Sequence, residues 1–118
     1  PIFSHIATIA AFRHGADWRR QMLGYVEGNI EFLEKFCRER IPQIRPLRPQ
    51  AWFLVWLDCR ALGLDDDSLN RLFIDEAGLA LNDGEMFSPG GEGFMRLNVG
   101  TSRTILKDAL ESLEKVIR

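Results

Sequence analysis

The sequence contains few of the residues from which metal centres and disulfide frameworks are built. Only two of its 118 residues are cysteine and two are histidine. Cys37 and Cys59 are 22 positions apart with no CxxC motif, a spacing that predicts two free thiols. His5 and His14 have no cysteine, histidine or carboxylate at ligand spacing. We therefore expect no metal site.

Lysine is equally scarce. The three lysines, Lys35, Lys107 and Lys115, fall on the predicted polar faces of helices. A lysine that forms a Schiff base needs a desolvated pocket that lowers its pKa, and none of the three has such surroundings in the pattern. The residues also suggest no Ser/His/Asp or Cys/His arrangement for nucleophilic catalysis. The residues alone thus predict no catalytic centre in this chain.

Charge and hydropathy argue against two classes of partner. The net charge of −2 and the pI of about 5.7 provide no one-sided basic surface for nucleic acid. The apolar run "AWFLVWL" (51–57) is much shorter than the ~20 residues of a membrane-spanning helix. No secretory signal pattern is visible, so we expect a cytoplasmic protein. Because the chain opens on Pro1 rather than methionine, we also expect it to be cut from something longer.

The apolar residues that are present repeat with helical and strand periods. Helices are predicted from Ser4 to residue 12, from Asp17 to the residues before Pro42, over 64–78, and after Thr101 or Ser102. Strands are predicted over 51–58, 79–83 and 94–99, with 43–50 at most an edge strand. This order predicts an α+β two-layer sandwich, in which helices cover one face of a small, mostly antiparallel sheet.

The strand predicted over 51–58 is apolar on both faces. One face would carry Trp52, Leu54 and Trp56, which the predicted helices do not cover. An apolar patch of this kind is typical of an interface, so we expect a second domain or subunit to pack there.

An arginine interrupts the apolar strand in "GEGFMRLNVGTS" (91–102). Alternation places Met95 and Leu97 on the core face and Phe94, Arg96 and Asn98 on the other. A guanidinium can bind a carboxylate through two parallel hydrogen bonds, which makes Arg96 a candidate substrate ligand. The alternative is a solvated strand arginine or one arm of a surface ion pair. The preceding "SPGGEGF" (88–94) runs into a strand rather than a helix, which favours a flexible turn over a phosphate cradle.

These motifs resemble a known family. The segment "GLALNDGEMFSPGGEGFMRLNVGTSRTILKDALESL" (78–113) is similar to the C-terminal end of class I/II, fold-type I pyridoxal-phosphate enzymes. "FSHIATIAAFRHGADWRRQMLGYVEGNIEFLEKF" (3–36) and "PQAWFLVWLDCR" (49–60) resemble the cystathionine β-lyase-like carbon–sulfur lyase branch, whose members are often described as aminotransferases. The resemblance covers nearly the whole chain.

The resemblance implies a division of labour between two domains. Residues 1–16 would form an inter-domain helix segment and residues 17–118 the C-terminal small domain. An absent large domain would hold the Schiff-base lysine and bind pyridoxal phosphate, and the full-length enzyme would be a homodimer. This fragment would then contain no catalytic, cofactor-binding or metal-binding residue and would be inactive alone.

For the site, the resemblance implies that Arg96 binds the α-carboxylate of an amino-acid substrate. Many relatives have a proline before the arginine that matches Arg103, so "TSR" (101–103) leaves any role for Arg103 in doubt. The function it implies is that of a carbon–sulfur lyase. Two alternatives stay open: a true aminotransferase that uses the same Arg96, and a non-catalytic interaction module that docks through the Trp52/Trp56 face.

Overall fold

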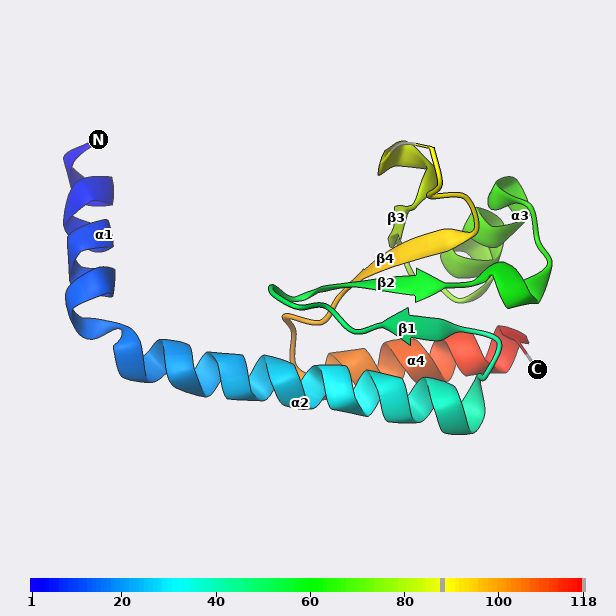
Figure 1. Ribbon diagram of the computed structural model, residues 1–118, viewed down its shortest axis with the longest axis horizontal. Coiled ribbons are helices and arrows are strands. Elements are labelled where there is room, and N and C mark those ends of the chain that lie inside the picture. Colours follow the sequence, from blue (N-terminus) through cyan, green and yellow to red (C-terminus); the bar gives the residue numbers. More distant parts are fainter. Residues whose placement is uncertain (88, 118) are drawn as a thin grey trace.

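The computed structural model describes residues 1–87 and 89–117. Its main elements in chain order are α1 (Ile2–His14), α2 (Ala16–Arg40), β1 (Arg45–Leu47), β2 (Leu54–Asp58), α3 (Asp66–Arg71), β3 (Asn82–Asp83), β4 (Phe94–Asn98) and α4 (Arg103–Ile117). Three short helical turns lie between them: η1 (Arg60–Leu62), η2 (Leu72–Glu76) and η3 (Glu85–Phe87). In Figure 1 the sheet lies against the paired helices α2 and α4, and α1 projects from the far end of α2.

The four strands form one antiparallel sheet in the order β1-β2-β4-β3. Val55 and Leu57 of β2 pair with Leu97 and Met95 of β4, and all four side chains are buried. Because side chains alternate along a strand, this register places the intervening residues on the opposite, open face. The predicted α+β two-layer sandwich is confirmed.

Helices α2 and α4 cover the buried face of the sheet. Their buried apolar residues recur every three or four positions, which places them on one side of each helix: Val26, Ile30, Leu33, Phe36 and Cys37 in α2, and Leu106, Leu110 and Leu113 in α4. Phe73, in the turn after α3, completes the core at 0% exposure. Each such side chain contributes roughly 1.5–3 kcal/mol by leaving water.

The starts of the first two helices differ from the prediction. Helix α1 begins at Ile2 after Pro1, so Ser4 is not its N-cap. Helix α2 is preceded by Gly15, and Asp17 lies in its first turn, where it pairs with Arg20 at 2.7 Å. A Cβ at position 15 would lie 2.5 Å from the carbonyl oxygen of Ala11. A side chain at this position would clash with that carbonyl, so the junction between the two helices requires glycine.

The prediction that Trp52 belongs to a strand is wrong. Strand β2 begins at Leu54, and Trp52 lies in the preceding bend with φ at 74° and 69% of its surface exposed. Its ring stacks on that of Phe53 at 4.7 Å. The last contact with the neighbouring strand is from Val99 N–H to the Phe53 carbonyl, and the chain turns away before it. The open face therefore carries Leu54 and Trp56 but not Trp52.

Helix α1 contributes nothing to this core. None of its residues is buried, and its large apolar side chains are 50–88% exposed: Ile2, Phe3, Ile6, Ile9 and Phe12. Figure 1 shows the helix standing clear of the sheet. Within the described residues, no helix is long and apolar enough to cross a bilayer.

Candidate functional site

A single row of side chains crosses the open face of the sheet. In register, Leu47 of β1 pairs with Trp56 of β2, Trp56 with Arg96 of β4, and Arg96 with Asn82 of β3. Arg96 thus lies in an interior strand with a tryptophan on one side and an amide on the other. The prediction that Arg96 projects from the face away from the core holds.

The Arg96 guanidinium is held without being neutralised. One terminal nitrogen donates to Asn82 Oδ1 at 3.1 Å, and Cζ lies 4.2 Å from the centre of the Phe87 ring. Its Nε is buried and has no hydrogen-bond partner within residues 1–87 and 89–117. In the same part of the chain no carboxylate pairs with Arg96. A fixed, uncompensated guanidinium can receive an anion.

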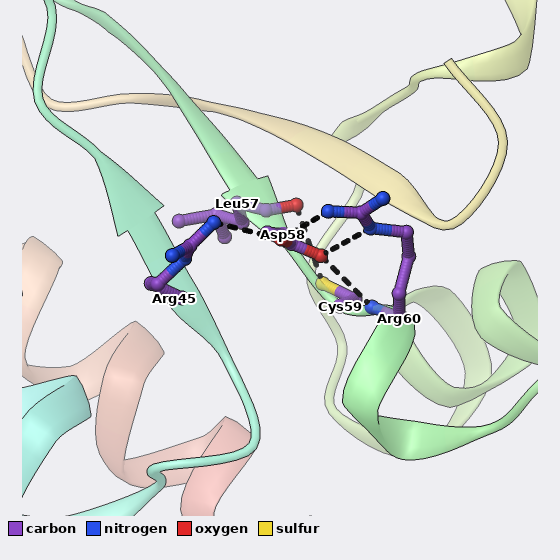
Figure 2. Close-up of polar contacts among 5 residues, drawn as sticks. All are labelled: Arg45, Leu57, Asp58, Cys59 and Arg60. Atoms are coloured by element: carbon purple, nitrogen blue, oxygen red, sulfur yellow. Dashed lines mark hydrogen bonds and ion pairs between the residues drawn. The ribbon is translucent and has the colours of Figure 1, made fainter. Parts of the chain in front are cut away.

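Two other arginines near this face share one carboxylate. Figure 2 shows Arg60 bound side-on to Asp58, with Nε to Oδ1 at 2.9 Å and a terminal nitrogen to Oδ2 at 2.8 Å. Arg45 approaches the same carboxylate at 3.4 Å. The side-chain hydrogen bond from Arg60 is the main cause that lowers the pKa of Asp58 from 3.8 to about 2. The pairs of Arg45 and Arg60 with Asp58 connect β1 and the turn after β2 to the end of β2. Arg96, by contrast, pairs with no carboxylate among the described residues.

Three aromatic rings lie on the same face of the sheet as the Arg96 side chain. Phe87 meets Trp56 edge-on at 5.5 Å, and Trp56 meets Phe94 edge-on at 6.2 Å. Beside them lies a groove of about 300 Å³, lined by Leu47, Trp56, Phe87, Pro89, Gly90, Gly91 and Phe94. The Arg96 guanidinium therefore lies beside an apolar surface rather than among other charges.

The loop that carries Phe87 depends on close backbone contact. A Cβ on Gly84 would lie 2.2 Å from the Gly91 carbonyl oxygen, and a Cβ on Gly91 would lie 2.0 Å from that of Gly84. Both positions must be glycine for the two ends of the loop to meet. Ser88, part of the quoted glycine-rich motif, lies outside the described residues.

Known proteins are similar to this chain. No protein-family model matches the sequence. The chain is 35% identical over 115 residues to the cystathionine β-lyase PatB of Bacillus subtilis, covering 98% of this chain and 30% of PatB. It is 32% identical over 112 residues to the protein MalY of Escherichia coli, covering 95% of this chain and 29% of MalY.

Solved structures agree with the sequence relatives. A pyridoxal-phosphate-bound crystal structure from Clostridium difficile 630 superposes with a TM-score of 0.95 at 35% identity, over 98% of this chain and 30% of the other. A pyridoxal-phosphate-bound carbon–sulfur lyase from Staphylococcus hominis superposes with a TM-score of 0.87 at 28% identity, over 95% and 30%. The chain is similar to a C-terminal part of cystathionine β-lyase-like, fold-type I pyridoxal-phosphate enzymes. It matches a C-terminal part and spans about 30% of the length of these relatives.

Pyridoxal phosphate is the cofactor of this family, but the described residues offer no cradle for it. Two loop amides that could hold a phosphate already donate to carboxylates, Gly90 N–H to Glu92 and Gly93 N–H to Asp66, both at 2.8 Å. All three lysines are exposed on helices. Neither amide is therefore free to bind the phosphate of the cofactor.

Arg103, to which the sequence assigned no role, connects the start of α4 to α2. Its Nε donates to Asn29 Oδ1 at 2.7 Å and its backbone N–H to the Tyr25 hydroxyl at 2.7 Å. Asn29, which is 0% exposed, also donates to the carbonyls of Val99 and Thr101, both at 2.8 Å. Sequence reasoning missed Asn29, although a polar residue inside the apolar stripe of α2 was a usable signal.

The two cysteines are buried free thiols on the core side of the sheet. Burial raises the pKa of both Cys37 and Cys59 from 9.0 to about 12. In Cys59 the nearby Asp58 carboxylate adds to this rise. Thiols that stay protonated are poor nucleophiles and poor metal ligands, so their place in the fold is that of small core residues.

Proposed function

We propose that this chain supplies the substrate-carboxylate site of a pyridoxal-phosphate-dependent carbon–sulfur lyase or aminotransferase that acts on amino acids. The observation that supports the proposal is the Arg96 guanidinium on the open face of the sheet, which donates to Asn82 but has no carboxylate partner among the described residues. Asn82 and Phe87 fix the plane of that group from two sides. A guanidinium held in this way binds a carboxylate with little loss of side-chain freedom.

The energetics favour an anionic ligand at Arg96. Charge-assisted hydrogen bonds are roughly twice as strong as neutral ones. The α-carboxylate of an amino acid supplies both the charge and the acceptors. By holding the carboxylate, Arg96 would fix the orientation of the substrate's α-carbon, which lowers the entropic barrier of the following step.

The remaining functions would belong to the rest of the enzyme. The chain spans about 30% of its relatives, and the apolar side chains of α1 are uncovered. Residues 1–16 would be an inter-domain segment and 17–118 the small domain, with a large domain carrying the cofactor and the reactive lysine. We further propose that the complete enzyme is a homodimer and that this fragment alone is inactive.

Carbon–sulfur lyase is the preferred activity over transamination. Among the sequence relatives, PatB and two others at 35–36% identity are named as cystathionine β-lyases, and those named as aminotransferases are 24–29% identical. The structure from Clostridium difficile 630 at 35% identity is named as an aminotransferase, so transamination stays the second candidate. Incubation of the full-length enzyme with cystathionine separates the two activities. Pyruvate and ammonia formed without a keto-acid acceptor indicate the lyase, and turnover only with an acceptor indicates the transferase. The interaction-module alternative has less support, because Trp52 and Trp56 do not share one face.

Arg96→Lys in the full-length enzyme tests the proposed role directly. Lysine keeps the charge but cannot form the two parallel hydrogen bonds of a guanidinium. We therefore expect the KM for the amino acid to rise about 10- to 100-fold, which corresponds to about 1.4–2.8 kcal/mol of binding free energy. Cofactor affinity, followed by cofactor absorbance, should stay within about twofold. The matched control is Arg45→Lys, on the same face but paired with Asp58. An equal loss of substrate and cofactor binding would contradict the assignment.

A further inference from the structure

The short strand β3 carries two polar residues that lie on opposite faces of the sheet. Asn82 pairs in register with Arg96, and Asp83 pairs with Met95, which is 0% exposed. Because side chains alternate along a strand, Asn82 lies with Arg96 on the open face and Asp83 lies on the face of the core. The guanidinium therefore has an amide as its cross-strand neighbour, although a carboxylate occupies the next position of the chain.

The amide of Asn82 holds the guanidinium without compensating its charge. Its Oδ1 accepts a hydrogen bond from a terminal nitrogen of Arg96 at 3.1 Å. An aspartate at this position would have almost the same shape, but its carboxylate would bind the same nitrogen roughly twice as strongly. It would then occupy the group that the proposed substrate carboxylate needs. The charge of residue 82 thus separates an open anion site from a closed ion pair.

The Asp83 carboxylate is bound by neutral donors instead of Arg96. Asn70 Nδ2, from helix α3, donates to Asp83 Oδ2, and the backbone N–H of Glu85 donates to Asp83 Oδ1 at 3.0 Å. Among residues 1–87 and 89–117, no cation pairs with this carboxylate. Both of its oxygens are therefore occupied without the use of a positive charge.

Strand β3 is too short to fix its own register. It has two residues, and a shift by one residue would exchange the faces of Asn82 and Asp83. The Gly84 N–H opposes this shift from within the sheet, because it donates to the Phe94 carbonyl at 2.9 Å. Asn70 opposes it from outside the sheet through its bond to Asp83. A side chain of α3 therefore helps to decide whether an amide or a carboxylate faces Arg96.

We propose that Asn82 and Asn70 are positioning residues that keep Arg96 available for a substrate carboxylate. Asn82 presents a neutral acceptor to the guanidinium, and Asn70 retains the Asp83 carboxylate on the opposite face of the sheet. The inference rests on the proposed role of Arg96 and adds to it the residues that determine the net charge of the site. It also assigns an influence on substrate affinity to α3, which carries no residue of the open face.

Variants of residue 82 in the full-length enzyme test the role of Asn82. The probes are L-alanine, which has no leaving group for elimination, and L-alanine methyl ester, which has no carboxylate. Isothermal titration calorimetry gives both dissociation constants. Asn82→Ala should raise that of alanine about threefold through the lost hydrogen bond, and Asn82→Asp should raise it at least about tenfold. The dissociation constant of the ester should change less than about twofold in both.

The order of these two variants separates positioning from a structural role. If Asn82 only stabilised the fold, aspartate would be the milder change, because it keeps the shape and the acceptor that alanine lacks. Alanine binding that is weaker in Asn82→Ala than in Asn82→Asp overturns the inference. With cystathionine, KM should rise in Asn82→Asp while kcat changes less than about threefold, since saturating substrate displaces the internal carboxylate.

A double variant tests the role of Asn70. Asn70→Ala removes the donor to Asp83 Oδ2 and should raise the dissociation constant of alanine about threefold. Adding Asp83→Asn should restore the native value within about twofold, because no carboxylate then competes for Arg96. The amide oxygen can still accept from Glu85 N–H. A loop that was merely loosened would not recover, so failure of the second substitution to restore binding overturns the role of Asn70.

Two controls distinguish this inference from the proposed function. Gln43→Glu adds the same charge at an exposed position before β1, the edge strand opposite β3, and should leave both dissociation constants unchanged. Arg96→Lys should weaken alanine but not its ester. If Arg96→Lys does so while Asn82→Asp binds alanine as the native enzyme does, the inference fails and the role of Arg96 stands. If Arg96→Lys leaves alanine binding unchanged, the proposed function itself fails.

Discussion

Among the polar residues of the fold, Asn29 is the one whose substitution we expect to lower the free energy of unfolding most. Its side chain is 0% exposed and makes three hydrogen bonds to groups at least 70 residues away in the chain. Two go to the carbonyls of Val99 and Thr101, which follow β4, and the third comes from Arg103 at the start of α4. The strand that carries Arg96 and the last helix are thereby attached to α2 at one residue.

The magnitude follows from the groups that Asn29→Ala would leave unpaired. The bond to the Val99 carbonyl is buried, and an unsatisfied buried acceptor costs about 1–3 kcal/mol. The other two bonds are partly accessible to water, and each loses about 0.5 kcal/mol. The expected loss is about 3 kcal/mol of the free energy of unfolding. Asn29→Asp has nearly the same shape but cannot donate to the two carbonyls, so it should lose at least as much.

Equilibrium urea unfolding followed by far-ultraviolet circular dichroism measures this loss. With a slope of about 1.5 kcal/mol per molar urea, a 3 kcal/mol loss lowers the midpoint by about 2 M. Gln21→Ala, an exposed position on the same helix, is the control and should change the midpoint little. If Asn29→Asp unfolds at the native midpoint, the two donated hydrogen bonds do not stabilise the fold and the reasoning fails.

Two further predictions concern titratable groups. The pKa of Asp58 lies at about 2 in the folded chain, below its ordinary 3.8, so the stability it contributes is present above about pH 4 and is lost as the pH falls toward 2. Because solvent surrounds both arginines, that contribution is about 1 kcal/mol. Asp58→Asn should therefore flatten the curve of unfolding free energy against pH over this range. An unchanged slope of that curve would show that the ion pair is not the cause. The raised pKa values of Cys37 and Cys59 keep both thiols protonated at pH 8, so a disulfide reagent should label neither until urea unfolds the chain. Rapid labelling of the folded chain would mean that this part of the core opens.

Much of the fold follows from local patterns. The apolar stripes of α2 and α4 and the alternation in β4 require only one buried side for each element, and both features occur in the structure. Predictions failed at boundaries, where non-local contacts decide. Gly15 rather than Asp17 precedes α2 because two helix backbones meet there, and Trp52 leaves the strand because the ladder ends at Phe53.

In the candidate site, too, some features follow from local sequence patterns and others depend on contacts between distant residues. Periodicity placed Arg96 on the face away from the core, but it could not distinguish a substrate ligand from an arm of an ion pair. That distinction depends on whether a carboxylate lies within reach, and Asp58 lies close to Arg60 and Arg45 while none pairs with Arg96 among the described residues. The contact between Phe87 and the Arg96 guanidinium was not predicted from the sequence. It depends on the path of the loop between Gly84 and Gly91, which carries Phe87.

The sequence by itself determined the layers of this protein and the face from which Arg96 projects, because helical and strand periods are properties of neighbouring residues. Only the tertiary structure decided which arginines pair with a carboxylate, which rings line the groove, and that Asn29 joins β4 and α4 to α2. Those are contacts between residues far apart in the chain, and their geometry is set by the packing of the whole sheet on its helices.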